Sequence, residues 1–136
     1  MSETAVMVPA HTLPQRTPLE LIVLARRGLA EARTTNSFAQ SYATAHLAAL
    51  RAAAAVLAAR AKPTPTSSRR RITSVWVLLT MVAPELADWA AFFAAGAAKR
   101  SAAESGIAVV TGEEADHLIV HAARFIELVQ ESLDLT

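Results

Sequence analysis

The chain has 136 residues, enough for one domain with a buried core. Hydrophobic residues make up 53% and charged residues 18%, a composition that excludes a disordered protein. The net charge of +1 is too small for a strong global attraction to nucleic acid, and the absence of cysteine excludes disulfides and thiolate metal sites. Aromatic residues are only 5%, and the abundant alanine favours helices.

The first 16 residues contain Pro9 and Pro14 and show no helical period. We therefore expect a flexible tail at 1–16, followed by a single helical domain at 17–136. The first residues lack the basic stretch and apolar run of a secretory signal, so we expect a cytoplasmic protein.

Three helices are predicted from capping boxes, in which a Ser or Thr stands three residues before a Glu or Gln. These helices are expected over about 17–34, 37–61 and 111–133. The last one has the clearest apolar stripe, and the second is apolar over most of its circumference, which places it in the middle of a bundle. The capping pairs are Thr17 with Glu20, Ser37 with Gln40, and Thr111 with Glu114.

The stretch between the second and last of these helices predicts a linker over 62–68 and then two more helices. The third helix is expected after the arginines at 69–71 and runs through Val82, and the fourth is expected from Glu85 to about Glu104. Residues 72–98 are long and apolar enough to suggest a membrane span, but two acidic residues and a proline near the middle favour two buried helices. We expect no membrane association.

No stretch shows the sustained alternation of a strand, and no internal repeat is present. The sequence therefore predicts an all-α fold, a compact bundle of four to five helices.

Two histidines on the last predicted helix, His117 and His121, lie four residues apart, with glutamates one turn earlier. That spacing can place two imidazoles and a carboxylate around one metal ion. No glutamate base stands between the histidines, and the solvated flank of an amphipathic helix is the favoured interpretation. We therefore predict no metal and no cofactor. His46 is interpreted as a hydrogen-bonded core or interface residue, and His11 supports no inference.

Two groups of charged residues are weak candidates for a site. Arg69, Arg70 and Arg71 follow the linker and are candidate phosphate contacts, although such runs are common at solvated helix starts. Arg100 and Glu104 are four apart at the end of the fourth helix, and they form either a structural pair or a polar site at the edge of the bundle. Neither a glycine-rich phosphate loop nor a nucleophile–base motif is present.

Three segments carry a resemblance to the HEPN superfamily, specifically to a small actinobacterial branch of stand-alone HEPN-domain proteins. They are Ser41–Leu57, an alanine-rich helix, Ala83–Gly106, which is the most specific, and Glu114–Val129. The resemblance implies a HEPN-like bundle that often forms a homodimer through helix faces.

Many HEPN proteins are metal-independent ribonucleases of toxin–antitoxin or defence systems, and the resemblance implies a motif of Arg, four to six residues, and His. None of the four histidines of this chain has an arginine at that offset. The nearest analogue is Arg100 with Glu104, which has glutamate where histidine would act. The resemblance therefore transfers no ribonuclease residues.

Our leading hypothesis is a non-catalytic HEPN-domain interaction module that self-associates and binds a protein or nucleic-acid partner. Two alternatives remain open. One is a diverged HEPN ribonuclease acting through Arg100 and Glu104, and the other is a HEPN partner of a separately encoded nucleotidyltransferase.

Overall fold

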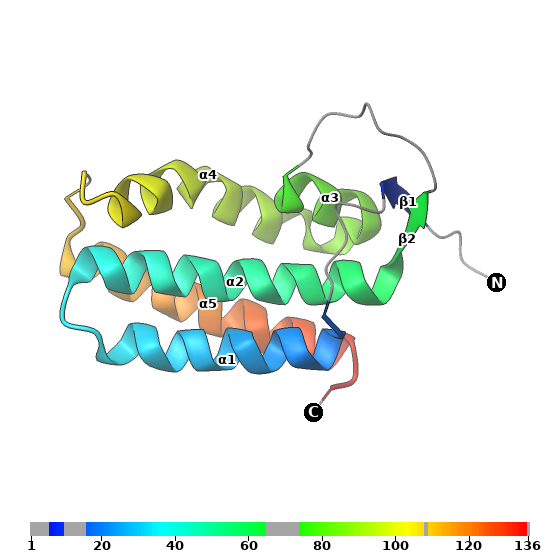
Figure 1. The fold of residues 1–136 in the computed structure, drawn as a ribbon, viewed down its shortest axis with the longest axis horizontal. Helices are drawn as coiled ribbons and strands as arrows, with labels where there is room; N and C mark the ends of the chain where they lie inside the picture. Colours follow the sequence, from blue (N-terminus) through cyan, green and yellow to red (C-terminus); the bar gives the residue numbers. More distant parts are fainter. Residues whose placement is uncertain (1–5, 10–15, 65–73, 108, 136) are drawn as a thin grey trace.

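The computed structural model describes residues 6–9, 16–64, 74–107 and 109–135. In these residues it contains five α-helices, a short 3-10 helix and two four-residue strands, and the predicted all-α bundle is confirmed (Figure 1). The helices are α1 (Pro18–Thr34), α2 (Phe38–Arg60), α3 (Val75–Val82), the 3-10 helix η2 (Pro84–Leu86), α4 (Ala87–Glu104) and α5 (Gly112–Ser132).

Helix α2 lies at the centre and contacts each of the other four α-helices. Figure 1 shows α1 below it, α5 behind it, and α3 with α4 above it; α2 and α5 run in one direction, and α1 and α4 in the other. The sequence of α2 suits this position, because alanines recur on all its buried faces and allow neighbouring backbones to approach closely. α2 also has the length and hydropathy of a membrane span, but 61% of its most apolar window is buried inside the bundle.

The helix boundaries follow the capping residues. Thr17 and Thr111 each accept a hydrogen bond from the backbone of a glutamate three residues later, and each glutamate side chain accepts one in return. Ser37 caps α2 in the same way through the Gln40 backbone, without a reciprocal bond. Gly106 follows α4 at a φ of 74°, where glycine has no steric penalty.

The region from Ser74 to Glu104 contains two helices that meet at a proline, as the sequence predicts. Helix α3 begins at Val75 with Ser74 as its cap, and Pro84 opens the 3-10 turn that precedes α4. The fourth α-helix therefore starts at Ala87 rather than at Glu85, because the first turn after the proline is 3-10.

The structure contains a pair of short strands that the sequence pattern does not predict. β1 (Val6–Pro9) pairs in parallel with β2 (Ala61–Thr64), with Val6 opposite Ala61 and Pro9 opposite Thr64. Each strand has only four residues, too few for alternation to be visible, and Pro9 and Pro63 favour extended backbone. The rest of the expected tail, apart from Arg16, lies outside the described residues, as does most of the expected linker.

The aromatic part of the core joins α3, α4 and α5. Phe93 and Phe125 are fully buried, and their ring centroids lie 5.2 Å apart. Trp76 of α3 stacks on Phe93 at 5.2 Å, so all the upper helices contribute an aromatic ring. Each of these rings buries a large apolar area, and their contacts hold α3 and α4 against the rest of the bundle.

Candidate functional site

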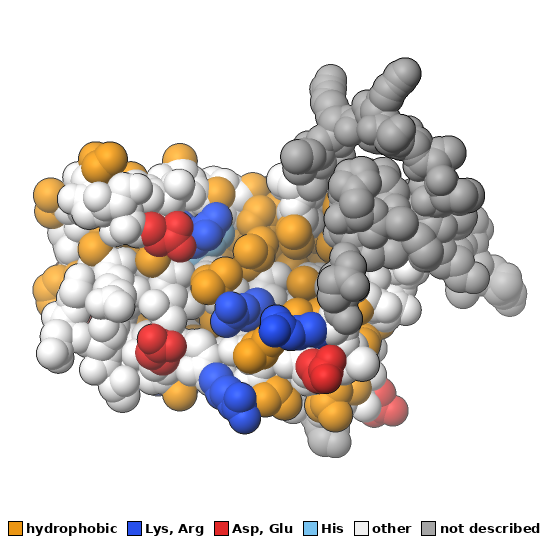
Figure 2. Space-filling view, viewed as in Figure 1, with side chains coloured by type: hydrophobic (Ala, Val, Ile, Leu, Met, Phe, Trp, Pro, Cys, Tyr) orange, Lys and Arg blue, Asp and Glu red, His pale blue; other side chains and the backbone are white. Residues whose placement is uncertain are grey.

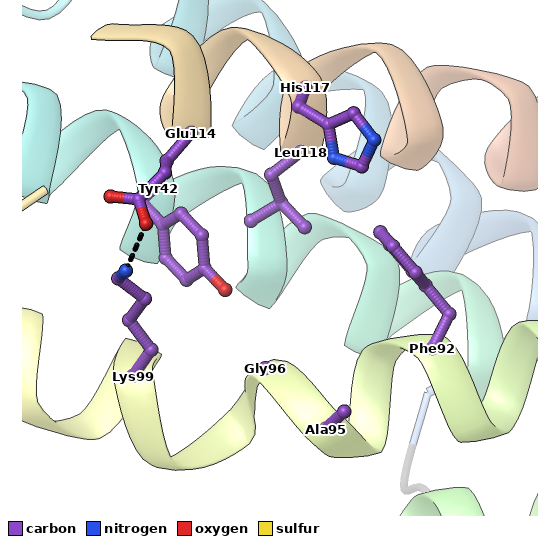
Figure 3. Close-up of a pocket in the computed structure, with 8 residues that line it drawn as sticks. All are labelled: Tyr42, Phe92, Ala95, Gly96, Lys99, Glu114, His117 and Leu118. Atoms are coloured by element: carbon purple, nitrogen blue, oxygen red, sulfur yellow. Dashed lines mark hydrogen bonds and ion pairs between the residues drawn. The ribbon is translucent and has the colours of Figure 1, made fainter. Parts of the chain in front are cut away.

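A pocket lies between α4 and α5 because the backbones of these two helices scarcely approach each other. Bulky side chains separate the helices at one end, and an ion pair joins them at the other (Figure 3). The pocket has a volume of about 290 Å³, and its floor is formed by α2. It is lined by Tyr42, Phe92, Ala95, Gly96, Lys99, Glu114, His117 and Leu118.

Aromatic rings form the end of the pocket nearest the core. Phe92 stacks on His121 with 4.7 Å between ring centroids and makes an edge contact with Phe93 at 5.0 Å. His117 lies 5.9 Å from Phe92 and 4.2 Å from His121. Since Phe92 and His117 both line the pocket, two ring surfaces are available there to a planar guest.

Tyr42 of α2 supplies the one hydroxyl group among the residues that line the pocket. The side chain is nearly buried, with the residue 8% exposed, and Figure 3 shows its oxygen directed into the space between α4 and α5. This hydroxyl makes no hydrogen bond within the described residues, and it is not among their fully buried polar atoms, so solvent or a ligand can reach it. Burial raises the pKa of Tyr42, so the group is a neutral donor and acceptor at physiological pH.

Gly96 makes room for this hydroxyl. A Cβ atom at position 96 would lie 2.8 Å from the Tyr42 oxygen, closer than carbon and oxygen can approach without a shift. The same Cβ would lie 3.7 Å from Nε2 of His46, so the two α2 side chains face one short stretch of α4. Position 96 is therefore a glycine because the Tyr42 side chain closely approaches the α4 backbone.

Lys99 and Glu114 close the other end of the pocket. The Lys99 ammonium donates a hydrogen bond to one carboxylate oxygen of Glu114, and the other oxygen accepts from the Thr111 backbone at 3.0 Å. The lysine contact and the Thr111 backbone hydrogen bond lower the pKa of Glu114. The capping box of α5 therefore also fixes the partner of the one lysine in the pocket wall.

His46 lies fully buried behind the pocket. Its Nε2 is 2.7 Å from the Phe93 carbonyl oxygen, which can only accept, so Nε2 carries the proton in the neutral ring. The other ring nitrogen, Nδ1, is buried and has no partner among the described residues. Burial lowers the pKa of His46, the hydrogen bond to Phe93 partly opposes this, and the charge of Arg100 lowers it further.

Arg100 and Glu104 lie at the edge of the bundle, as the sequence places them. Nη1 of Arg100 is 3.4 Å from a carboxylate oxygen of Glu104, a long contact between partly exposed groups. Nε of Arg100 is buried and has no partner among the described residues. The charge of Arg100 acts on His46 across the α2–α4 contact, although 54 positions separate the two in the chain.

The chain matches a family model described as HEPN_SAV_6107-like HEPN over residues 32–130, more than half of its length. The chain belongs to the HEPN family. The matched region contains α2, α3, α4 and nearly all of α5, and therefore every residue of the pocket. No curated protein and no solved structure matches the chain.

Not all of the candidate residues proposed for this HEPN domain from sequence can be placed. Arg69, Arg70, Arg71 and His11 lie outside the described residues. His117 is exposed, as expected of a solvated flank, whereas His121 is half-buried against Phe92. Within the part of the chain that the structure describes, no group of three or more His, Asp or Glu residues is arranged to hold a metal ion.

Sequence reasoning missed the pocket itself. Glu114 is predicted only as part of a capping box, and Tyr42, Phe92 and Lys99 belong to no sequence motif. The available signals were a lone tyrosine in an alanine-rich helix and a glycine inside the fourth helix, each of which needs a tertiary reason. Neither signal indicates which helices meet.

Proposed function

We propose that this HEPN-domain protein is a non-catalytic interaction module whose α4–α5 pocket receives one unpaired base of a nucleic-acid partner. The observation that carries the proposal is the Tyr42 hydroxyl, which belongs to a residue only 8% exposed, has no hydrogen-bond partner in the described residues, and lies between aromatic rings and a lysine. The side chains that line the pocket match the chemical groups of a nucleotide. A base offers a flat face to Phe92 and His117 and hydrogen-bonding groups to Tyr42, and a phosphate attracts Lys99.

The residues that line the pocket do not include the arginine–histidine pair of the usual HEPN ribonuclease motif. RNA cleavage needs a proton-transfer group active near neutral pH and a cation for the developing charge. His46 is fully buried, with Nε2 bound to a backbone carbonyl, so it does not face a ligand in the pocket. His117 faces the pocket without an arginine among the lining residues. These observations support binding without catalysis.

A binding assay tests this proposal. Fluorescence anisotropy with labelled single-stranded RNA at one fixed salt concentration should give saturable binding. Phe92→Ala should raise the Kd by about tenfold, because stacking of one base contributes about 1–3 kcal/mol. Lys99→Ala should weaken binding more than Arg27→Ala, which removes an equal charge from the exposed face of α1. Equal effects of Lys99→Ala and Arg27→Ala, or no saturable binding, would count against a base in this pocket.

The structure also favours one alternative by a specific observation. The charge of Arg100 of α4 acts on His46 of α2, so folding brings an arginine toward a histidine that lies 54 positions earlier in the chain. This arrangement supports the diverged ribonuclease hypothesis. Its test is incubation with single-stranded and structured RNA. Cleavage that is lost in Arg100→Ala, in Glu104→Ala and in His46→Gln, with folding intact, would replace the non-catalytic proposal.

We further propose that the module self-associates through the outer face of α4. Ala91, Ala94, Ala95 and Ala98 of this helix are exposed, and Val77 and Met81 of α3 are 53% and 49% exposed. Figure 2 shows apolar side chains reaching the surface over α4, at the top of the view. Small side chains on such a face allow two helices to approach closely, and a homodimer would bury them.

Light scattering tests the self-association. The wild-type protein should have twice the 14.4 kDa mass of one chain at micromolar concentration. Ala94→Arg should give a monomer, whereas Ala30→Arg, on the exposed side of α1, should leave the dimer intact. A wild-type monomer would exclude the dimer, and a dimeric Ala94→Arg variant would exclude this face.

A further inference from the structure

His117 and His121 form a close imidazole pair at the rim of the pocket. They stand one helical turn apart on α5, and their ring centroids are 4.2 Å apart with an angle of 41° between the ring planes. Imidazole nitrogens bind a transition-metal ion at about 2.0–2.1 Å, so two rings that share one ion must lie within a few ångströms of each other. The separation of this pair meets that requirement.

The hydrogen bond of His121 decides which of its nitrogens is available. Nδ1 lies 2.8 Å from the backbone carbonyl oxygen of His117, and because this oxygen can only accept, Nδ1 must carry the proton. The lone pair of the neutral ring is then on Nε2. A metal-binding histidine usually donates its other N–H to a carbonyl or carboxylate in this way, which fixes the tautomer and the ring orientation.

Packing holds the same ring in place. Phe92 stacks on His121 at 4.7 Å with 26° between the planes, and Trp89 lies 6.3 Å from it on the same helix as Phe92. His117 is exposed, so the pair is open to solvent on its outer side. One imidazole is thus fixed by its neighbours, and an ion can reach the pair without unfolding the helix.

We infer that His117 and His121 form a two-histidine chelate for a divalent transition-metal ion that prefers imidazole nitrogen, such as Zn²⁺, Cu²⁺ or Ni²⁺. Ca²⁺ and Mg²⁺ are excluded because they require several oxygen ligands. No third His, Asp or Glu joins the pair among the described residues, so water fills the remaining positions on the ion. This inference goes beyond the proposed base-binding function and does not depend on it.

The test is titration of the untagged full chain with Zn²⁺ by isothermal calorimetry, and with Cu²⁺ by electron paramagnetic resonance. We expect one saturable ion per chain and a Cu²⁺ spectrum with two coupled nitrogens. His117→Ala and His121→Ala should each abolish saturable binding, and His11→Ala, which removes a histidine outside the described region, should bind as the wild type does. Excess Mg²⁺ should not compete.

Thermal unfolding gives a second measurement that separates lost binding from lost folding. Zn²⁺ should raise the Tm of the wild type and of His11→Ala, because an ion that binds only the folded chain stabilises it. The Tm of the two ligand variants should be unaffected by Zn²⁺, while their circular dichroism remains helical. Saturable binding that survives both substitutions, or no Zn²⁺ response in the wild type, would overturn the inference.

Discussion

The buried histidine behind the pocket should make the stability of the fold depend on pH. Burial lowers the pKa of His46 from its usual 6.5, because the charged ring would lose its hydration next to Arg100. The unfolded chain therefore takes up this proton at a higher pH than the folded chain does. Between the two pKa values the unfolded state binds more protons, so the free energy of unfolding decreases as the pH falls below 6.5.

We expect His46→Gln to reduce this dependence on pH. The amide can still donate to the Phe93 carbonyl, but it does not titrate. Urea unfolding over a series of pH values should show a shallower loss of stability below pH 6.5 in the variant and no difference in slope above it. The other three histidines are present in both proteins and cancel in the comparison. Identical slopes below 6.5 would contradict the assignment.

The contact between Tyr42 and Gly96 predicts a substitution effect of unusual sign. Alanine usually stabilises a helix interior relative to glycine by about 0.5–1 kcal/mol. Here the added methyl group would lie 2.8 Å from the tyrosine oxygen, and overpacking costs about 1–3 kcal/mol. Gly96→Ala should therefore destabilise the protein.

A double-mutant cycle checks this explanation. Tyr42→Phe removes the oxygen, so Gly96→Ala should be neutral or stabilising in that background. Urea unfolding of the four proteins measures the coupling between the two positions. If Gly96→Ala costs the same free energy in both backgrounds, the clash is not the cause.

At the scale of the helices, α5 supplies a buried aromatic ring, Phe125, against which aromatic side chains of α4 pack. Phe125 is fully buried, and its centroid lies 5.2 Å from that of Phe93 and 5.6 Å from that of Trp89. Phe125→Ala should reduce the free energy of unfolding by about 3–5 kcal/mol. Val120→Ala, at a position on the same helix that is 55% exposed, should change it by less than about 0.5 kcal/mol. Chemical denaturation measures both, and equal losses would contradict the assigned packing.

Most helix boundaries could be predicted because their causes are local. Thr17, Thr111 and Pro84 act on backbone groups within four residues, so their effect is readable in the sequence. The strand pair could not be predicted, because β1 and β2 are separated by more than fifty residues and depend on each other. The pairing of two strands is a tertiary property.

The pocket was beyond sequence reasoning for the same reason. Tyr42, Gly96 and Glu114 come from three helices, and their meeting depends on which face each helix turns toward the others. An amphipathic stripe identifies a buried face only when the opposite face is polar, and α2 is apolar nearly all round. The Arg100–Glu104 spacing was visible because it lies within one helix.

At the scale of the molecule, the helices differ in how many neighbours hold them. α2 contacts all four of the other α-helices, whereas α3 packs mainly on α2 and α4. Amides in α2 should exchange with solvent only through global unfolding, and those of α3 and the C-terminal half of α4 should exchange faster through local opening.

Hydrogen exchange followed by mass spectrometry measures this gradient. The experiment should use the Ala94→Arg variant, so that self-association does not protect α4. Peptides from α3 or from the C-terminal half of α4 that are as strongly protected as those from α2 would contradict the expected order of opening.

The fit between Tyr42 and Gly96 also has an evolutionary consequence. Position 96 cannot change freely while Tyr42 stays, since any side chain there meets the tyrosine oxygen. Members of the family that carry a larger residue at the position of Gly96 should therefore carry a smaller one, or phenylalanine, at the position of Tyr42. Family members that keep both residues keep the tyrosine hydroxyl in the pocket. Family members that replace both have lost this hydroxyl, and with it the polar group that would recognise a ligand.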